Sequence, residues 1–144
     1  MASAPKLATG LALLVALVAC GREGAGPRDR VRQFGECRVP AGAVQVEDLL
    51  QGDGVRWTFH AVVVMSPSRL PEFVEGCGFA MSDLRRGYEH EEFRPTTLED
   101  SSEVAWWRLP EPNATAGTHR GKRHLFVVER DTDVAAFIYA EGGP

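Results

Sequence analysis

The run VRWTFHAVVVM, residues 55–65, constrains the fold more than any other part of this 144-residue chain. It is rich in β-branched and aromatic residues, which favour strands. Apolar and polar residues alternate at first, and the second half is continuously apolar. A continuously apolar run of this length is typical of a strand that is buried on both faces. We therefore expect residues 55–65 to form a central strand of a packed sheet.

A helix is expected soon after this strand, over residues 68–77. Ser66 or Ser68 can cap its N-terminus, and a first helical turn tolerates proline. Four side chains share one face at helical spacing: Leu70, Phe73, Val74 and Cys77. A strand that runs into a capped helix predicts a layer in which the helix packs on the sheet.

Two β-rich runs lie near the end of the sequence, KRHLFVVER at residues 122–130 and VAAFIYAEG at 134–142. The polar triplet DTD separates them, which predicts a β-hairpin. Paired with the strand at 55–65, this hairpin gives an antiparallel sheet of at least three strands, covered by the helix at 68–77.

The remaining segments are less regular. Residues 43–54, AVQVEDLLQGDG, place Val46, Leu49 and Leu50 at helical spacing before two glycines, so we expect a short helix there. Residues 79–118 are polar and broken by prolines, and predict a long loop. The expected fold class is therefore α+β: a small antiparallel sheet of three or more strands with a C-terminal β-hairpin, packed against one or two short helices.

The first twenty residues have the composition of an export signal. Lys6 is the only charge, and residues 7–19 are apolar apart from Thr9 and Gly10. As a helix this apolar run would span about 20 Å at 1.5 Å per residue, which is short of the roughly 30 Å hydrocarbon core of a membrane. A cleaved signal is therefore the better interpretation.

The residues LVAC, Leu17 to Cys20, end this apolar run and resemble the lipobox of bacterial lipoproteins. The resemblance covers residues 1–20 only, and no family is identified for the rest of the chain. It implies that Cys20 carries a diacylglycerol on its sulfur, that the chain is cut before Cys20, and that the new amino group is acylated, for example with palmitate. Gly21, where aspartate often marks retention in the inner membrane, implies the outer membrane. The alternative is an ordinary secreted protein in which Cys20 has no role.

Three parts of the chain follow from this interpretation: a signal peptide at 1–19, the lipidated cysteine with a flexible tether at 20–33, and a single small domain at 34–144. Loss of residues 1–19 removes Lys6 and moves the net charge from −4 to −5. An acidic chain of this kind disfavours nucleic acid as a partner. The one basic cluster, HRGKRH at 119–124, reads as a solvated entry to a strand.

Three cysteines are present, and lipidation of Cys20 would leave Cys37 and Cys77 as a possible disulfide pair. In the chain-entropy model, closing a loop of this length stabilises a fold by about 4 kcal/mol. The alternative is two unpaired, buried thiols.

The acidic cluster YEHEEF, residues 88–93, is the densest group of ionisable side chains. His90 with Glu92 or the distant His119 has the chemistry of a transition-metal site. Neighbouring residues of a loop point in different directions, however, and no second spaced ligand pair follows. We therefore interpret the cluster as a solvated loop, and we expect no metal ion or cofactor.

His60 and His124 lie in two expected strands, and they would approach one another if those strands pair. Asp131 or Asp133, in the adjacent turn, could supply a carboxylate. Because the sequence has no G-x-S-x-G motif or other hydrolase signature, structural histidines are the default interpretation.

Trp106 and Trp107 are consecutive, so an extended segment would turn one inward and one outward. We expect at least one in the core, which leaves the other as a possible binding residue. The expected function is that of a lipid-anchored envelope protein whose domain binds another envelope protein or a wall component, without catalysis. The alternative is a small envelope hydrolase that uses His60 or His124.

Overall fold

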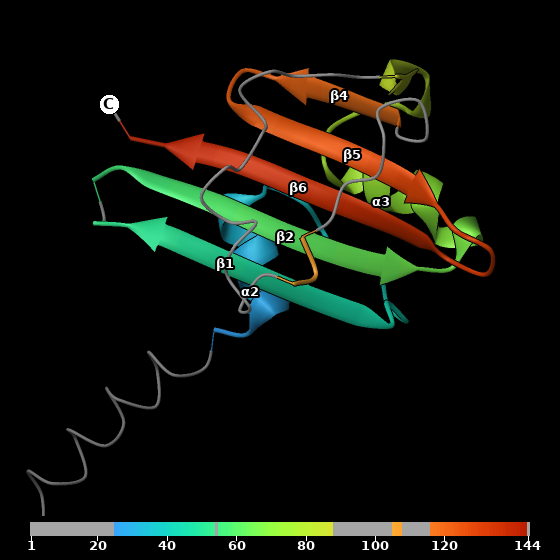
Figure 1. The fold of residues 1–144 in the computed structure, drawn as a ribbon, viewed down its shortest axis with the longest axis horizontal. Helices are drawn as coiled ribbons and strands as arrows, with labels where there is room; N and C mark the ends of the chain where they lie inside the picture. Colours follow the sequence, from blue (N-terminus) through green and yellow to red (C-terminus); the bar gives the residue numbers. More distant parts are fainter. Residues whose placement is uncertain (1–24, 54, 88–104, 108–115, 144) are drawn as a thin grey trace, which may run out of the picture.

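The computed structural model describes residues 25–53, 55–87, 105–107 and 116–143. In these segments six strands form one sheet in the order β1-β2-β6-β5-β4-β3, and every neighbouring pair is antiparallel (Figure 1). The elements are α2 (Pro27–Phe34), β1 (Gln45–Gly52), β2 (Trp57–Met65), α3 (Leu70–Gly76), β3 (Arg85–Arg86), β4 (Ala116–Arg120), β5 (Arg123–Glu129) and β6 (Val134–Gly142), with 3₁₀ turns at Pro67–Arg69 and Met81–Asp83.

The sequence-based expectations for the sheet centre are confirmed. β2 is an inner strand, β5 and β6 form the C-terminal hairpin, and β6 pairs directly with β2. The expected helix is the 3₁₀ turn continued by α3, although neither Ser66 nor Ser68 caps it with its side chain. The α+β class fits, but the domain is mostly sheet, and the sheet is larger than the minimum of three strands.

β2 and β6 are buried on both faces, which divides the apolar side chains into two clusters. On one face, α2 and α3 cover the sheet, as Figure 1 shows. Val31, Phe73 and Val74 are fully buried between these helices and the strands. On the other face, Val62, Phe126 and Phe137 pack with Trp107 (the remaining members are Val64 and Ala135).

The expected helix at 43–54 is wrong, because Gln45–Gly52 forms strand β1. Eight residue pairs join it to β2, from Gln45 opposite Val64 to Gly52 opposite Trp57. In this register Val46 and Asp48 face α2, while Leu49 lies opposite His60. Pairing with a strongly apolar neighbour decides the structure here, because tertiary contacts override weak local helical spacing.

Residues 27–34, most of which were expected to belong to the tether at 20–33, form helix α2. Pro27 occupies the first turn, where its missing N–H costs nothing, and Asp29 near the start and Arg32 near the end complement the helix dipole. Val31 is fully buried. Arg30 donates hydrogen bonds to both carboxylate oxygens of Asp48 on β1, and the one from Nη2 is 2.9 Å long.

The expected disulfide is confirmed. Cys37 and Cys77 are joined, with Cα atoms 4.0 Å apart, and both are buried. The bond connects the segment just after α2 to the end of α3, and so ties the two helices together on one face of the sheet.

Replacing Val31 with alanine should lower the free energy of unfolding by about 2 kcal/mol, because two buried methyl groups are lost and a cavity remains. Urea denaturation followed by circular dichroism measures the change. Arg32→Ala, exposed on the same helix, is the matched control and should change stability by less than about 0.5 kcal/mol. Equal stability of both variants and the wild type would mean that α2 does not belong to the folded unit.

Candidate functional site

One row of side chains crosses five strands on the sheet face opposite the helices. The register places neighbours of this row directly opposite one another on adjacent strands. It runs through Leu49, His60, Tyr139, His124 and His119. Every histidine of the described segments therefore lies in a single row, while His90 lies outside those segments.

Aromatic contacts hold the middle of this row. The ring of His60 lies 4.9 Å from that of Tyr139 and 4.8 Å from that of Trp107, both in edge-to-face geometry. Trp107 also packs edge-on against Phe137 at 5.4 Å. The ring of Tyr139 lies 6.0 Å from that of His124. Trp107 therefore lies against His60 and covers part of this face.

The two tryptophans divide as the sequence predicts. Trp107 is buried, and Trp106 is half-buried beside it, with ring centroids 6.1 Å apart. Trp107 is a core residue of this face, and Trp106 keeps an exposed edge next to the row.

His60 is buried, with 5% of its surface exposed, and its Nδ1 atom has no hydrogen-bond partner among the described residues. Burial lowers the pKa of His60 from 6.5 to about 4, because the charged ring loses its hydration. His60 is therefore neutral at pH 7. A base with so low a pKa is poorly matched to proton transfer near neutral pH.

The carboxylates expected near the histidines lie elsewhere. His60 and His124 do not pair directly, because β6 runs between their strands and places Tyr139 between them. Asp131 and Asp133 lie in the turn at the opposite end of β5 from His124, and Asp133 pairs with Arg130.

Glu141 is the carboxylate that reaches the row, because it accepts a hydrogen bond from the Tyr139 hydroxyl. Sequence reasoning missed Tyr139 and Glu141. Their two-residue spacing on one strand indicates a shared face, but only the β2–β6 register shows that this is the face of the histidines.

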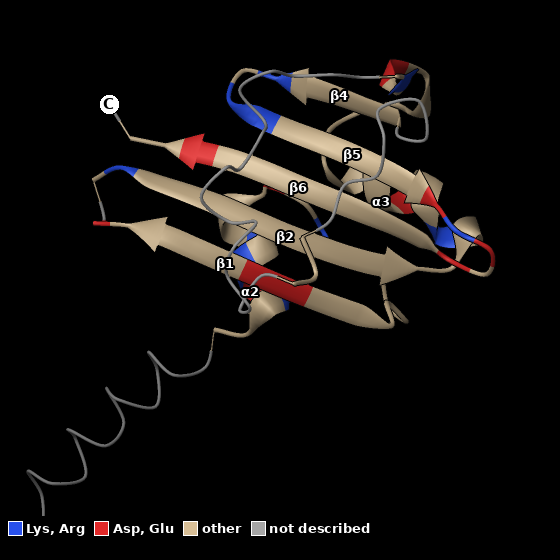
Figure 2. Cartoon of the chain, in the orientation of Figure 1, with Lys and Arg blue, Asp and Glu red and all other residues tan. Residues whose placement is uncertain are grey.

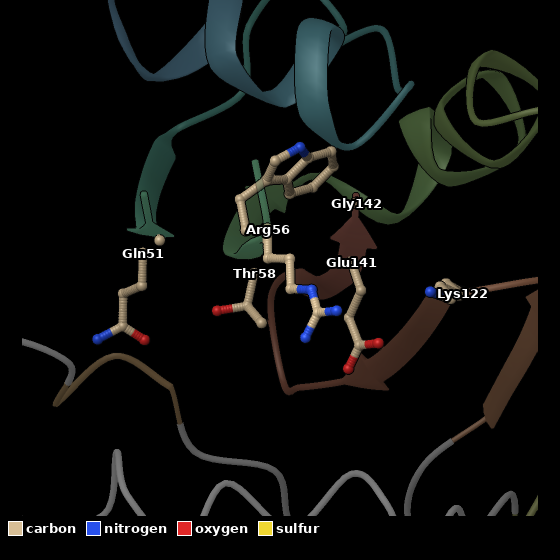
Figure 3. A pocket seen from close by; sticks show the side chains of 8 residues that line it. Gln51, Arg56, Thr58, Lys122, Glu141 and Gly142 are labelled. Carbon is tan, nitrogen blue, oxygen red and sulfur yellow. The ribbon is translucent and has the colours of Figure 1, made fainter. Parts of the chain in front are cut away.

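A pocket of about 590 Å³ lies at the end of the sheet, next to the histidine row. Gln51, Thr58 and Glu141 come from a second row on the same face, across β1, β2 and β6. Arg56 precedes β2, and Lys122 comes from the β4–β5 turn. Figure 3 shows the Arg56 and Glu141 side chains extending toward the same space beside Thr58.

The pocket has a mixed polar and apolar lining and carries charges of both signs. Figure 2 shows the basic residues of the β4–β5 turn and of the start of β2, and the acidic residue near the end of β6. Gly142 and Trp57 also line the pocket, and a side chain at Gly142 would overlap the indole of Trp57, so only glycine fits there. Such a pocket can bind a ligand that offers both hydrogen-bond donors and acceptors.

Two features that the sequence analysis discussed lie outside the described segments. These are Cys20, the expected lipidation site, and the cluster YEHEEF at residues 88–93, interpreted as a solvated loop. Within residues 25–53, 55–87, 105–107 and 116–143, no group of three or more His, Cys, Asp or Glu side chains is arranged to hold a metal ion. In the same segments, no helix has the length and apolar character needed to cross a membrane.

Comparisons of this chain with protein-family models, with curated proteins and with solved structures find no match.

His60 should make stability depend on pH. His60 takes up a proton near pH 6.5 in the unfolded chain but only near pH 4 in the folded protein, so acid favours unfolding between these two pH values. The stabilising contribution of neutral, buried His60 is fully present above about pH 6.5. As the pH falls to about 4, the free energy of unfolding drops by about 3 kcal/mol, and below about pH 4 His60 causes no further change. Urea denaturation at a series of pH values measures it.

The matched variants for this measurement are His60→Phe and His119→Gln. The first removes the titrating group but keeps a ring of similar size, so it should flatten the slope between pH 6.5 and 4. The second changes an exposed histidine of the same row and should keep the slope. An unchanged slope in folded His60→Phe would show that His60 does not titrate as stated.

Proposed function

We propose that this chain is a lipid-anchored bacterial envelope protein, held in the outer membrane through Cys20, whose domain binds a partner without catalysis. The observation that carries the location is the buried disulfide Cys37–Cys77 in a chain that begins with a signal-like segment ending in LVAC. Structural disulfides form in oxidising compartments outside the cytoplasm. The disulfide and the N-terminal sequence therefore favour the same side of the inner membrane.

The position of α2 adds a constraint to this proposal. Pro27, the first residue of α2, follows Cys20 by seven positions. A chain extends by about 3.3–3.6 Å per residue, so at most about 25 Å separates the lipidated residue from the folded domain. A domain anchored in this way stays close to the membrane surface, with α2 as its nearest element along the chain.

The pocket, and Trp106 elsewhere on the same face, support a binding function. Arg56 and Lys122 can contact acidic groups of a ligand, and Gln51 and Thr58 can exchange hydrogen bonds with its amide or hydroxyl groups. Trp106 offers an aromatic edge on the same face. The partner is accordingly another envelope protein or a wall component that presents polar groups at this end of the sheet.

The hydrolase alternative receives less support. A catalytic histidine needs a carboxylate or hydroxyl within hydrogen-bond reach. The Nδ1 atom of His60 has no partner in the described segments, and the Tyr139 hydroxyl is directed to Glu141 instead.

Cys20→Ser should abolish lipidation, because serine offers no thiol for the diacylglycerol. The measurements are the mass of the mature N-terminal peptide and the protein's distribution between membrane and soluble fractions after a high-salt wash. We expect the wild type in the membrane fraction with an acylated N-terminal cysteine. Cys37→Ser, which removes a different thiol, should remain acylated. A Cys20→Ser protein that is still cut before residue 20 and stays in the washed membranes would contradict the proposal.

A photo-crosslinking amino acid at Gln51 should capture the partner in the native envelope as a discrete adduct, since Gln51 borders the pocket. The same amino acid at Glu75, exposed on α3 on the opposite face, is the control and should give no such adduct. Arg56→Glu should weaken the adduct about tenfold, because one charge-assisted hydrogen bond contributes about 1.5–3 kcal/mol. Equal adducts at both positions, or none at either, would contradict binding at this pocket.

A further inference from the structure

The backbone of Arg56 is held in place at the pocket by the turn that precedes β2. Its N–H donates to the Asp53 carboxylate over 3.0 Å, and its carbonyl accepts from the Asp53 N–H over 3.3 Å. The hydrogen bonds from the N–H groups of Arg56 and Val55 lower the pKa of Asp53, so this carboxylate is charged at neutral pH. Gly52 lies so close that a side chain there would overlap the Arg56 carbonyl. The starting point of the Arg56 side chain is therefore fixed.

The two cations of the pocket are Arg56 and Lys122, and both side chains are exposed. Within the part of the chain that the structure describes, neither side chain forms an ion pair or a hydrogen bond. A guanidinium group has five N–H donors in a fork that matches a carboxylate, and an ammonium group has three donors. Two cationic groups are therefore available to the carboxylates of a ligand.

Glu141 supplies the negative charge of the pocket. It lies opposite Thr58 in the pairing of β2 with β6, and its backbone N–H donates to the carbonyl of Lys122 over 3.2 Å. This hydrogen bond ties the β4–β5 turn to the end of β6. One carboxylate oxygen, Oε1, accepts the hydrogen bond from Tyr139, and the other has no partner among the described residues. The second oxygen can therefore accept a hydrogen bond from an ammonium group of a ligand.

The opposite charges of the pocket face the same space without pairing. Figure 3 shows the Arg56 and Glu141 side chains extending toward that space, yet no ion pair joins these two described side chains. Exposed ion pairs stabilise little, so a ligand that pairs with both groups does not have to break a strong contact. Two cations and one anion are complemented by two carboxylates and one ammonium group. The volume of about 590 Å³ lies within the range of small-ligand sites.

We propose that the pocket binds a short acidic peptide with a free amino group, an inference that rests on the proposed function and names the chemistry of the partner. Two carboxylates contact Arg56 and Lys122, and the amino group, as an ammonium ion, contacts Glu141. Amide groups of the peptide exchange hydrogen bonds with Gln51 and Thr58. A zwitterionic lipid headgroup has one phosphate and one ammonium group. It lacks the second anionic group and the amides, so it matches the lining less well.

The test uses the full-length protein, isotope-labelled for nuclear magnetic resonance and purified in detergent, and the dipeptide alanyl-glutamate, which has two carboxylates and one ammonium group. Trp57 lines the pocket, and its indole N–H gives a separate signal that Trp57→Phe identifies. We expect this signal to shift as the dipeptide is added, and the shift gives Kd. N-acetyl-alanyl-glutamate lacks the ammonium group, and alanyl-glutamine lacks one carboxylate. Each should bind about fivefold more weakly, as expected for the loss of one exposed ion pair.

Variants of the charged residues assign the contacts. Glu141→Gln keeps an acceptor for the Tyr139 hydroxyl but loses the charge. It should bind the dipeptide about fivefold more weakly and should not distinguish it from its acetylated form. Arg56→Gln should weaken binding of the dipeptide by a similar factor. Glu129→Gln, which changes an exposed carboxylate at the far end of β5, is the matched control and should bind as the wild type does.

Three results would overturn the inference. The first is no shift of the Trp57 signal with alanyl-glutamate. The second is equal affinity of the wild type for this dipeptide and its acetylated form. The third is tighter binding of phosphoethanolamine, which would assign the pocket to a lipid headgroup. A photo-crosslinked adduct at Gln51 in the native envelope, together with no response to the dipeptide, would overturn this inference and leave the proposed function standing.

Discussion

The pairing of β2 with β6 is the contact on which the rest of the structure depends. Nine residue pairs join the two strands, from Trp57 opposite Gly142 to Met65 opposite Val134. Both strands are buried on both faces, so each supplies side chains to both apolar clusters. The same register sets His60 beside Tyr139 and Thr58 beside Glu141, and thereby creates the histidine row and the polar row of the pocket. A shift by one residue would exchange the two faces and remove both.

Sequence reasoning recovers this centre well. The β-rich run at 55–65, the helix that follows it and the C-terminal hairpin each have a strong local pattern, and the tertiary structure agrees with that pattern. The pair Cys37 and Cys77 was predictable once Cys20 was set aside as the expected lipidation site. These elements are predictable because local preference and burial favour the same structure.

The errors arise where distant contacts decide the structure. In β1, Val46, Leu49 and Leu50 fit a helical face, and only pairing with β2 selects a strand. In α2, one buried valine and an ion pair with Asp48 hold a segment whose composition resembles a tether. The candidate site depends on distant contacts in the same way. The histidines can be found in the sequence, but the position of β6 between their strands cannot, so Tyr139 and Glu141 were missed.

Under the proposed anchoring through Cys20, the disulfide has a mechanical consequence. Tension applied there reaches α2 first, and then Cys37. From Cys37 the load can pass through the sulfur atoms to Cys77, so the 39 residues between the cysteines, which include all of β1 and β2, are bypassed. Pulling can strip α2 from the sheet, yet it cannot draw out the central strand β2 by its N-terminal end while the bond is intact. The covalent loop therefore acts as a mechanical stop between the point of attachment and the strand that organises both faces of the sheet.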